Sequence, residues 1–82
     1  MTSESRSLRT IAMEIKKEWN PVNYAAKPYL LAMSALDKIT DQYGMDSAYS
    51  IVQYFLGNSS TWRGEAARRI KAELKQMLKG AK

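Results

Sequence analysis

Cysteine and histidine are both missing from the 82 residues of this chain. Without cysteine there is no disulfide to stabilise a small fold and no thiolate to bind a metal ion. Without histidine the chain also lacks the usual general base near neutral pH, and with it the Ser–His–Asp and Cys–His nucleophile systems. We therefore expect no enzymatic activity, no cofactor and no metal site.

Long apolar runs are absent as well. No segment approaches the ~18 residues needed to span a bilayer, and the polar residues 1–6 are not followed by the apolar core of a signal peptide. A small chain without cysteine or a leader fits a reducing compartment. The sequence therefore predicts a cytoplasmic protein that does not act at a membrane.

Glycine and proline are scarce, with four and two residues respectively, and they fall where helices are expected to begin or end. Between them, apolar residues recur at helical spacing in four stretches, and no strand-like alternation of useful length is present. The sequence predicts an all-α fold, a compact bundle of about four short helices formed by residues 7–82, behind a disordered tail at residues 1–6. The expected helix starts are Ser7, Pro28, Asp46 and one of residues 59–61, and the expected ends are Asn20, Gly44, Gly57 and Gly80.

Positive charge is concentrated at one end of the chain. Residues 62–82 hold seven basic and two acidic side chains, a surplus of five positive charges. This surplus equals the formal net charge of +5 for the whole protein. At about 100° per residue, five of these cations share one face of the last helix, beside its apolar stripe. They are Arg68, Lys71, Lys75, Lys79 and Lys82.

This basic face has more than one interpretation. Lysines four residues apart repel each other, so helix stability does not explain the spacing, although cations near a helix C-terminus do complement its dipole. The face either keeps the protein soluble, or binds the phosphates of a nucleic acid, or binds an acidic protein or a membrane surface. No aromatic residue lies along it, so a nucleic acid would be contacted through its backbone rather than by base stacking.

Aromatic residues in two other stretches are candidate partner contacts. Trp62 and Arg63 stand beside a glycine at the expected start of the last helix, and Tyr24 lies in the connector before Pro28. A homo-oligomer formed through Trp62 and Tyr24 is one such arrangement. The favoured alternative for the first stretch is that Trp62 packs over the edge of the bundle while Arg63 pairs with an acid of the second helix.

Three carboxylates, Asp37, Asp41 and Asp46, cluster around the expected end of the second helix. Asp37 and Asp41 share a helix face at this spacing, a pattern able to hold a hard cation such as Mg²⁺. A third ligand at fixed spacing and any nucleophile are missing. Solvation of that face is the preferred interpretation.

Three segments of the chain are distinctive together: NYAAKPYL at residues 23–30, IVQYFL at residues 51–56 and TWRGEAARRIK at residues 61–71. With these segments the chain resembles a group of short uncharacterised helical proteins encoded by phages and prophages, over residues 8 to about 78. The shared motifs carry no known chemistry. Small phage proteins of this kind are often accessory factors that bind host machinery, including inhibitors of CRISPR effectors.

The leading expectation is a non-catalytic, phage-type accessory protein in the host cytoplasm that binds a host or defence protein complex, as anti-CRISPR inhibitors do. The first alternative is a small basic protein that binds nucleic acid by contacting phosphates through its C-terminal helix. The second alternative is a self-assembling structural module.

Overall fold

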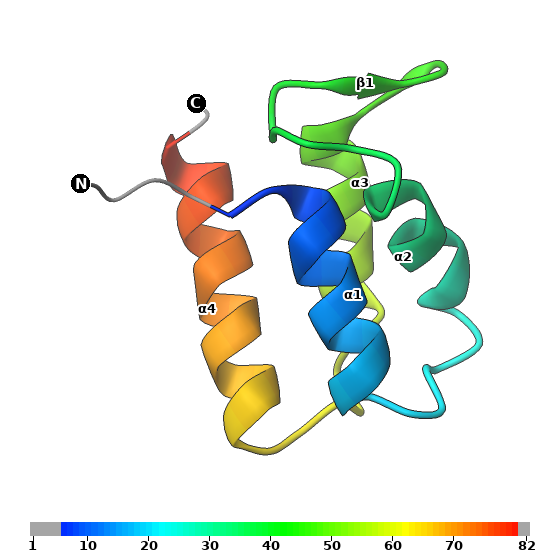
Figure 1. Cartoon of the computed structure of the whole chain (residues 1–82), viewed down its shortest axis with the longest axis vertical. Helices are drawn as coiled ribbons and strands as arrows, with labels where there is room; N and C mark the ends of the chain where they lie inside the picture. The colour runs from blue at the N-terminus through cyan, green and yellow to red at the C-terminus, as the bar shows by residue number, and fades with distance from the viewer. Residues whose placement is uncertain (1–5, 81–82) are drawn as a thin grey trace.

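The computed structural model of the chain describes residues 6–80. Within them it contains four helices and one short hairpin (Figure 1), so the fold is mainly helical as expected, with one small two-stranded sheet in addition. Each helix packs chiefly against two others, because α1 and α3 both lie against α2 and α4. The elements in chain order are α1 (Leu8–Glu18), α2 (Lys27–Met33), β1 (Gln42–Tyr43), β2 (Asp46–Ser47), α3 (Ala48–Gly57) and α4 (Glu65–Gly80).

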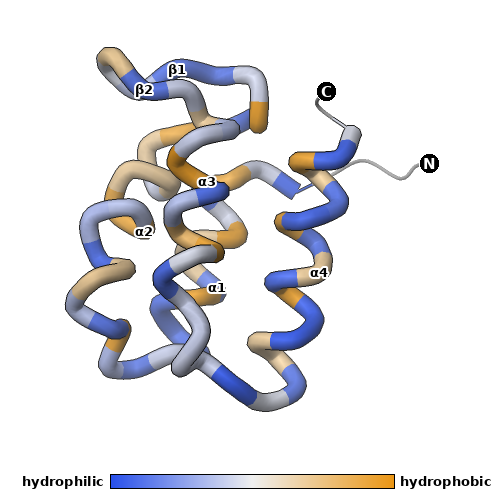
Figure 2. The backbone as a smooth tube through the Cα atoms, turned by 180° about the vertical axis from the view of Figure 1, so that it is seen from behind, coloured by the Kyte–Doolittle hydropathy of each residue, from blue (hydrophilic) through white to orange (hydrophobic). Residues whose placement is uncertain are grey.

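A single hydrophobic core lies between the helices. Figure 2 shows this most clearly for α4, whose hydrophobic positions recur along the side that faces the other helices. Full burial of one such aliphatic side chain contributes about 1.5–3 kcal/mol. The largest fully buried side chains, by helix, are Leu8, Ile11 and Ile15 of α1, Met33 of α2, Val52 and Phe55 of α3, and Ile70 and Leu74 of α4.

Helix α1 forms where the sequence predicts it. Its N-cap is Ser7, whose side-chain oxygen accepts a hydrogen bond from the backbone N–H of Thr10 at 3.1 Å. The helix ends at Glu18, just before the Asn20–Pro21 pair that was expected to stop it. The start and the end of α1 can therefore be predicted from the residues at its two ends.

Helix α2 is much shorter than predicted. The expected helix from Pro28 to Gly44 ends at Met33, although Leu36 still reaches the core. The reason is tertiary: the carbonyls of Leu36 and Asp37 accept hydrogen bonds from the backbone N–H groups of Arg9 and Leu8, at 2.9 and 2.8 Å. These are first-turn donors of α1 that have no partner inside their own helix.

Residues 42–47 form an antiparallel hairpin instead of the end of a helix. Gln42 pairs with Ser47 and Tyr43 with Asp46, which leaves Gly44 and Met45 as a two-residue turn. Gly44 has φ +61°, and only the first turn residue has a positive φ. This is the pattern of a type II′ turn, which matches the twist of the two strands. Gly44 is therefore a hairpin residue and not a helix cap.

Two expected N-caps are also wrong. Ser47, and not Asp46, caps α3 by accepting from the N–H of Ser50 at 3.1 Å. Helix α4 begins at Glu65 rather than directly after residues 59–61, because those residues continue the turn that follows α3. Ser59 is buried there and donates to the carbonyl of Leu56 at 3.0 Å. The predicted end of α3 at Gly57 is confirmed, and α4 extends to Gly80, the last described residue.

The expected disordered tail lies outside the described residues except for Arg6. The guanidinium of Arg6 donates to both carboxylate oxygens of Glu73, at 2.6 and 3.0 Å, and to Glu14 at 2.7 Å. Arg6 therefore joins α1 to α4. Among the described residues, no helix is both long enough and apolar enough to cross a membrane.

Candidate nucleic-acid interface

Helix α4 presents a basic side beside its buried side. Ala67, Ile70 and Leu74 face the core, while Arg68 and Lys75 are exposed. These sets lie on different sides because residues three and four apart stack above one another in a helix. Lys79 is exposed further along the same side.

The acidic residue in the middle of α4 points away from this side. Glu73 forms the ion pair with Arg6, and the neighbouring Arg69 pairs with Glu14 of α1 at 2.6 Å. Hydrogen bonds from Arg69, and to a smaller extent from Arg6, hold the pKa of Glu14 below its ordinary value. The carboxylates of Glu73 and Glu14 in turn raise the pKa of Arg6. Four charged side chains are thus used to join α1 to α4. Arg69 is not one of the residues of the basic face predicted from the sequence.

The remaining cations of α4 have no such partners among the residues that the structure describes. Within residues 6–80, no carboxylate oxygen lies within 4 Å of a side-chain nitrogen of the basic face. In the structure the basic face consists of four residues of α4, Arg68, Lys71, Lys75 and Lys79, together with Arg63, which lies just before the helix.

Lys71 is the most restrained member of the basic face. Its Nζ donates to the backbone carbonyl of Trp62 at 2.7 Å and lies 6.0 Å from the centre of the Trp62 ring. Partial burial lowers the pKa of Lys71, and the positive charges of Lys75 and Arg63 lower it further. Lys71 is therefore close enough to both Lys75 and Arg63 to be repelled by them, and an anion placed beside Lys71 would relieve that repulsion.

Arg63 belongs to this face, although the sequence assigned it to a separate partner surface. With Arg68, Lys71 and Lys75 it lines an open groove of about 410 Å³ that no carboxylate lines. Gly64, with φ +111°, makes the bend that places Arg63 beside the first turn of α4. Of the other predicted members, Lys79 lies outside this groove and Lys82 lies outside the described residues.

Trp62 is a core residue. It is only 4% exposed and stacks on Trp19 with ring centres 5.3 Å apart, and Trp19 meets Phe55 edge-on at 6.2 Å. The packing alternative for Trp62 is therefore the one observed, and only a small part of this residue reaches the groove that Arg63 lines. Arg63 is exposed and does not pair with an acid of the second helix within the described residues. Tyr24, by contrast, is 88% exposed.

The three aspartates do not form a cation site. Asp37 pairs with Arg9 at 2.7 Å, and Asp41 accepts the backbone N–H groups of Lys38 and Asp37, which lowers the pKa of Asp41. Neither lies on a helix, so the i, i+4 argument does not apply to them. Across residues 6–80 no group of three or more acidic side chains is placed to hold a metal ion.

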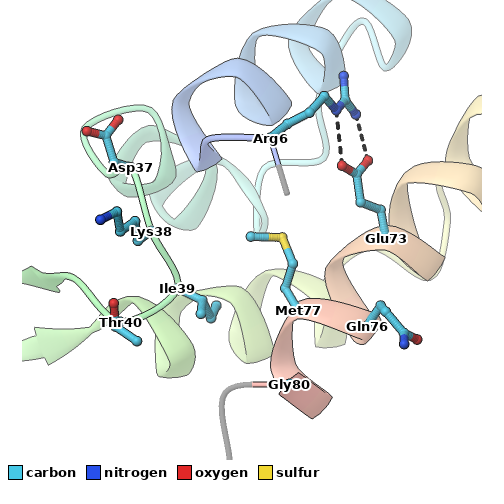
Figure 3. Close-up of a pocket in the computed structure, with 9 residues that line it drawn as sticks. All are labelled: Arg6, Asp37, Lys38, Ile39, Thr40, Glu73, Gln76, Met77 and Gly80. Atoms are coloured by element: carbon cyan, nitrogen blue, oxygen red, sulfur yellow. Dashed lines mark hydrogen bonds and ion pairs between the residues drawn. The ribbon is translucent and has the colours of Figure 1, made fainter. Parts of the chain in front are cut away.

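A second hollow, of about 550 Å³, lies between α4 and the loop after α2 (Figure 3). In the figure Arg6 points to Glu73 rather than into open space, and both ions are satisfied by each other. Asp37 at the same hollow is paired with Arg9. Of the cations that line this hollow, only Lys38 has no carboxylate within 4 Å among residues 6–80, so the hollow has fewer unpaired cations than the basic face.

No known protein family matches this chain, and neither a curated protein nor a solved structure is found to be similar to it.

Proposed function

We propose that this chain is a non-catalytic binding protein that contacts the phosphate backbone of a nucleic acid through the basic face of α4. The observation that carries the proposal is the set of cations on one side of α4 with no carboxylate partner within residues 6–80. Glu73, the acidic residue in the middle of α4, pairs with Arg6 and so does not neutralise these cations.

The dimensions of the face fit a phosphate backbone. Arg68 and Lys79 are eleven residues apart in α4, which corresponds to ~16 Å along the helix axis. Along B-DNA the same length covers about five base pairs. Because Trp62 is buried and the face has no exposed aromatic residue, we expect binding that depends on backbone charge and not on base sequence.

The wider role stays a proposal. A phage-type accessory protein with this face would reach host or defence machinery through the nucleic acid that such machinery carries. The resemblance supports that origin, and the charge distribution supports the type of ligand.

The first test is fluorescence anisotropy with labelled double-stranded DNA and RNA across a salt series. Four or five displaced counterions predict that the logarithm of the association constant falls with the logarithm of salt concentration with a slope of about −4 for DNA. Absence of binding at low salt would contradict the proposal.

Charge-reversal variants separate this face from general electrostatics. The double variant Arg68→Glu/Lys75→Glu lowers the formal net charge from +5 to +1, and so does the control Lys17→Glu/Lys38→Glu. All four residues are exposed, so both variants should fold with unchanged helicity. We expect the α4 variant to lose most of its affinity and the control to lose much less. Equal losses would mean that net charge alone drives binding, and the basic face would then have no special role.

A further inference from the structure

An apolar groove lies away from α4, between the end of α1 and the segment that leads into α2. It has a volume of about 490 Å³, and its apolar lining includes Val22, Tyr24, Pro28 and Leu31. We call it the Tyr24 groove. It shares no lining residue with the basic face of α4.

The apolar side chains of this groove are unusually open to water. Tyr24 is 88% exposed and Leu31 is 64% exposed, in a protein whose other leucines are largely buried. Met13, also 64% exposed, lies one turn before Lys16, the residue of α1 that lines the groove. Exposed apolar residues that adjoin one another around a hollow are typical of a binding surface.

The backbone that presents Tyr24 is fixed by Asn23. The side-chain oxygen of Asn23 accepts the N–H of Ala25 at 2.7 Å, and its amide donates to Thr61 at 3.3 Å. Such a side chain-to-backbone bond rigidifies the connector in the manner of an Asx turn. A partner would therefore meet a preformed surface, with a smaller entropic cost of ordering it.

The charges at the groove indicate the chemistry of its occupant. Lys16 and Lys27 line it, and no carboxylate does. A second copy of this chain is a poor match, because it would bring another net charge of +5 and another pair of lysines to the contact. From this complementarity we propose that the Tyr24 groove binds a short segment of another protein that combines large apolar side chains with carboxylates.

The experiment is a selection of peptides from a displayed library of short random sequences against the full chain. We expect enriched peptides to combine apolar residues with Asp or Glu, and to bind Lys16→Glu/Lys27→Glu at least about tenfold more weakly. Leu31→Asp should lose binding to a similar extent. Both variants change exposed positions, so circular dichroism should show an unchanged fold.

The control variants keep this proposal independent of the proposed function. Lys16→Glu/Lys27→Glu has the same formal net charge, +1, as Arg68→Glu/Lys75→Glu and Lys17→Glu/Lys38→Glu. We expect the α4 variant and the Lys17/Lys38 variant to retain most peptide binding, and the Lys16/Lys27 variant to retain most nucleic-acid binding. An equal loss of peptide binding in all three variants would contradict the proposal for the Tyr24 groove. It would leave the proposed function of α4 unaffected.

Three other outcomes would also overturn it. One is a selection that enriches no peptide, or enriches peptides without acidic residues. Another is concentration-dependent dimerisation in sedimentation velocity that Leu31→Asp removes, because the occupant would then be a second copy. The third is binding to phosphatidylglycerol vesicles that depends on Leu31, because the groove would then serve a lipid surface.

Discussion

Replacing Trp62 with alanine removes the aromatic side chain that joins the turn before α4 to α1. The ring is 4% exposed and stacks on Trp19, which itself contacts Phe55 of α3. Loss of a buried aromatic residue costs about 3–5 kcal/mol, since the transfer free energy is lost and a cavity remains. A domain of this length has a total stability of about 4–12 kcal/mol, so Trp62→Ala should remove a large share of it.

The assay is urea unfolding followed by far-ultraviolet circular dichroism, which does not depend on tryptophan emission. With a denaturant dependence of about 1 kcal/mol/M, a loss of 3 kcal/mol lowers the unfolding midpoint by about 3 M. Tyr24→Ala is the matched control, because Tyr24 is 88% exposed and its truncation should change stability by no more than about 0.5 kcal/mol. Trp62→Phe keeps part of the stack and should fall between them.

The reasoning fails if Trp62→Ala costs less than about 1 kcal/mol and unfolds at nearly the same urea concentration as Tyr24→Ala. That result would mean that the ring is not packed in the core. Trp62 would then again be a candidate partner contact, as the sequence alone allowed.

Two further predictions concern the acid dependence of stability and the hairpin turn. Hydrogen bonds from Arg69 and Arg6 hold the pKa of Glu14 below its ordinary value of 4.5. The ionised Glu14 side chain therefore contributes its full stabilisation above pH 4.5. This contribution is lost as the pH falls through the lower pKa of the folded state. Urea titrations over a pH series should therefore show a weaker acid loss for Glu14→Gln than for the wild type, and parallel curves would contradict the ion pairs. Gly44→Ala should destabilise the protein by about 1–2 kcal/mol, because φ is +61° there and nothing crowds the added carbon. Met45→Ala at the next turn position should leave the stability unchanged. If thermal unfolding showed the same loss of stability for Gly44→Ala and Met45→Ala, backbone strain at Gly44 would be excluded as the cause of that loss.

The basic face of α4 could be predicted from the sequence because it depends only on helical periodicity. Once residues 65–80 form a helix, Arg68, Lys71, Lys75 and Lys79 must lie beside the apolar stripe. What periodicity could not supply is the pairing of the other charges. Arg69 and Glu73 are neutralised by Glu14 and Arg6, residues more than fifty positions away.

The Tyr24 groove had only a partial signal in the sequence. The connector was recognisable as unusual, and Tyr24 was named as a partner contact. Lys16 and Leu31 were not named, because the sequence shows each of them only as an ordinary helix residue. The packing of α1 against the segment before α2 places both of them at one groove.

The sequence by itself determined the elements whose boundaries are local. Ser7 caps α1 with its own side chain, and Gly57 ends α3 where the apolar pattern stops. Only the tertiary structure decided where α2 ends and where Trp62 lies. The carbonyls of Leu36 and Asp37 leave the helical pattern because the first N–H groups of α1 need acceptors, and Trp62 turns inward because Trp19 gives it a stacking partner. Both choices depend on contacts between residues distant in the chain, and a periodic pattern carries no information about such contacts.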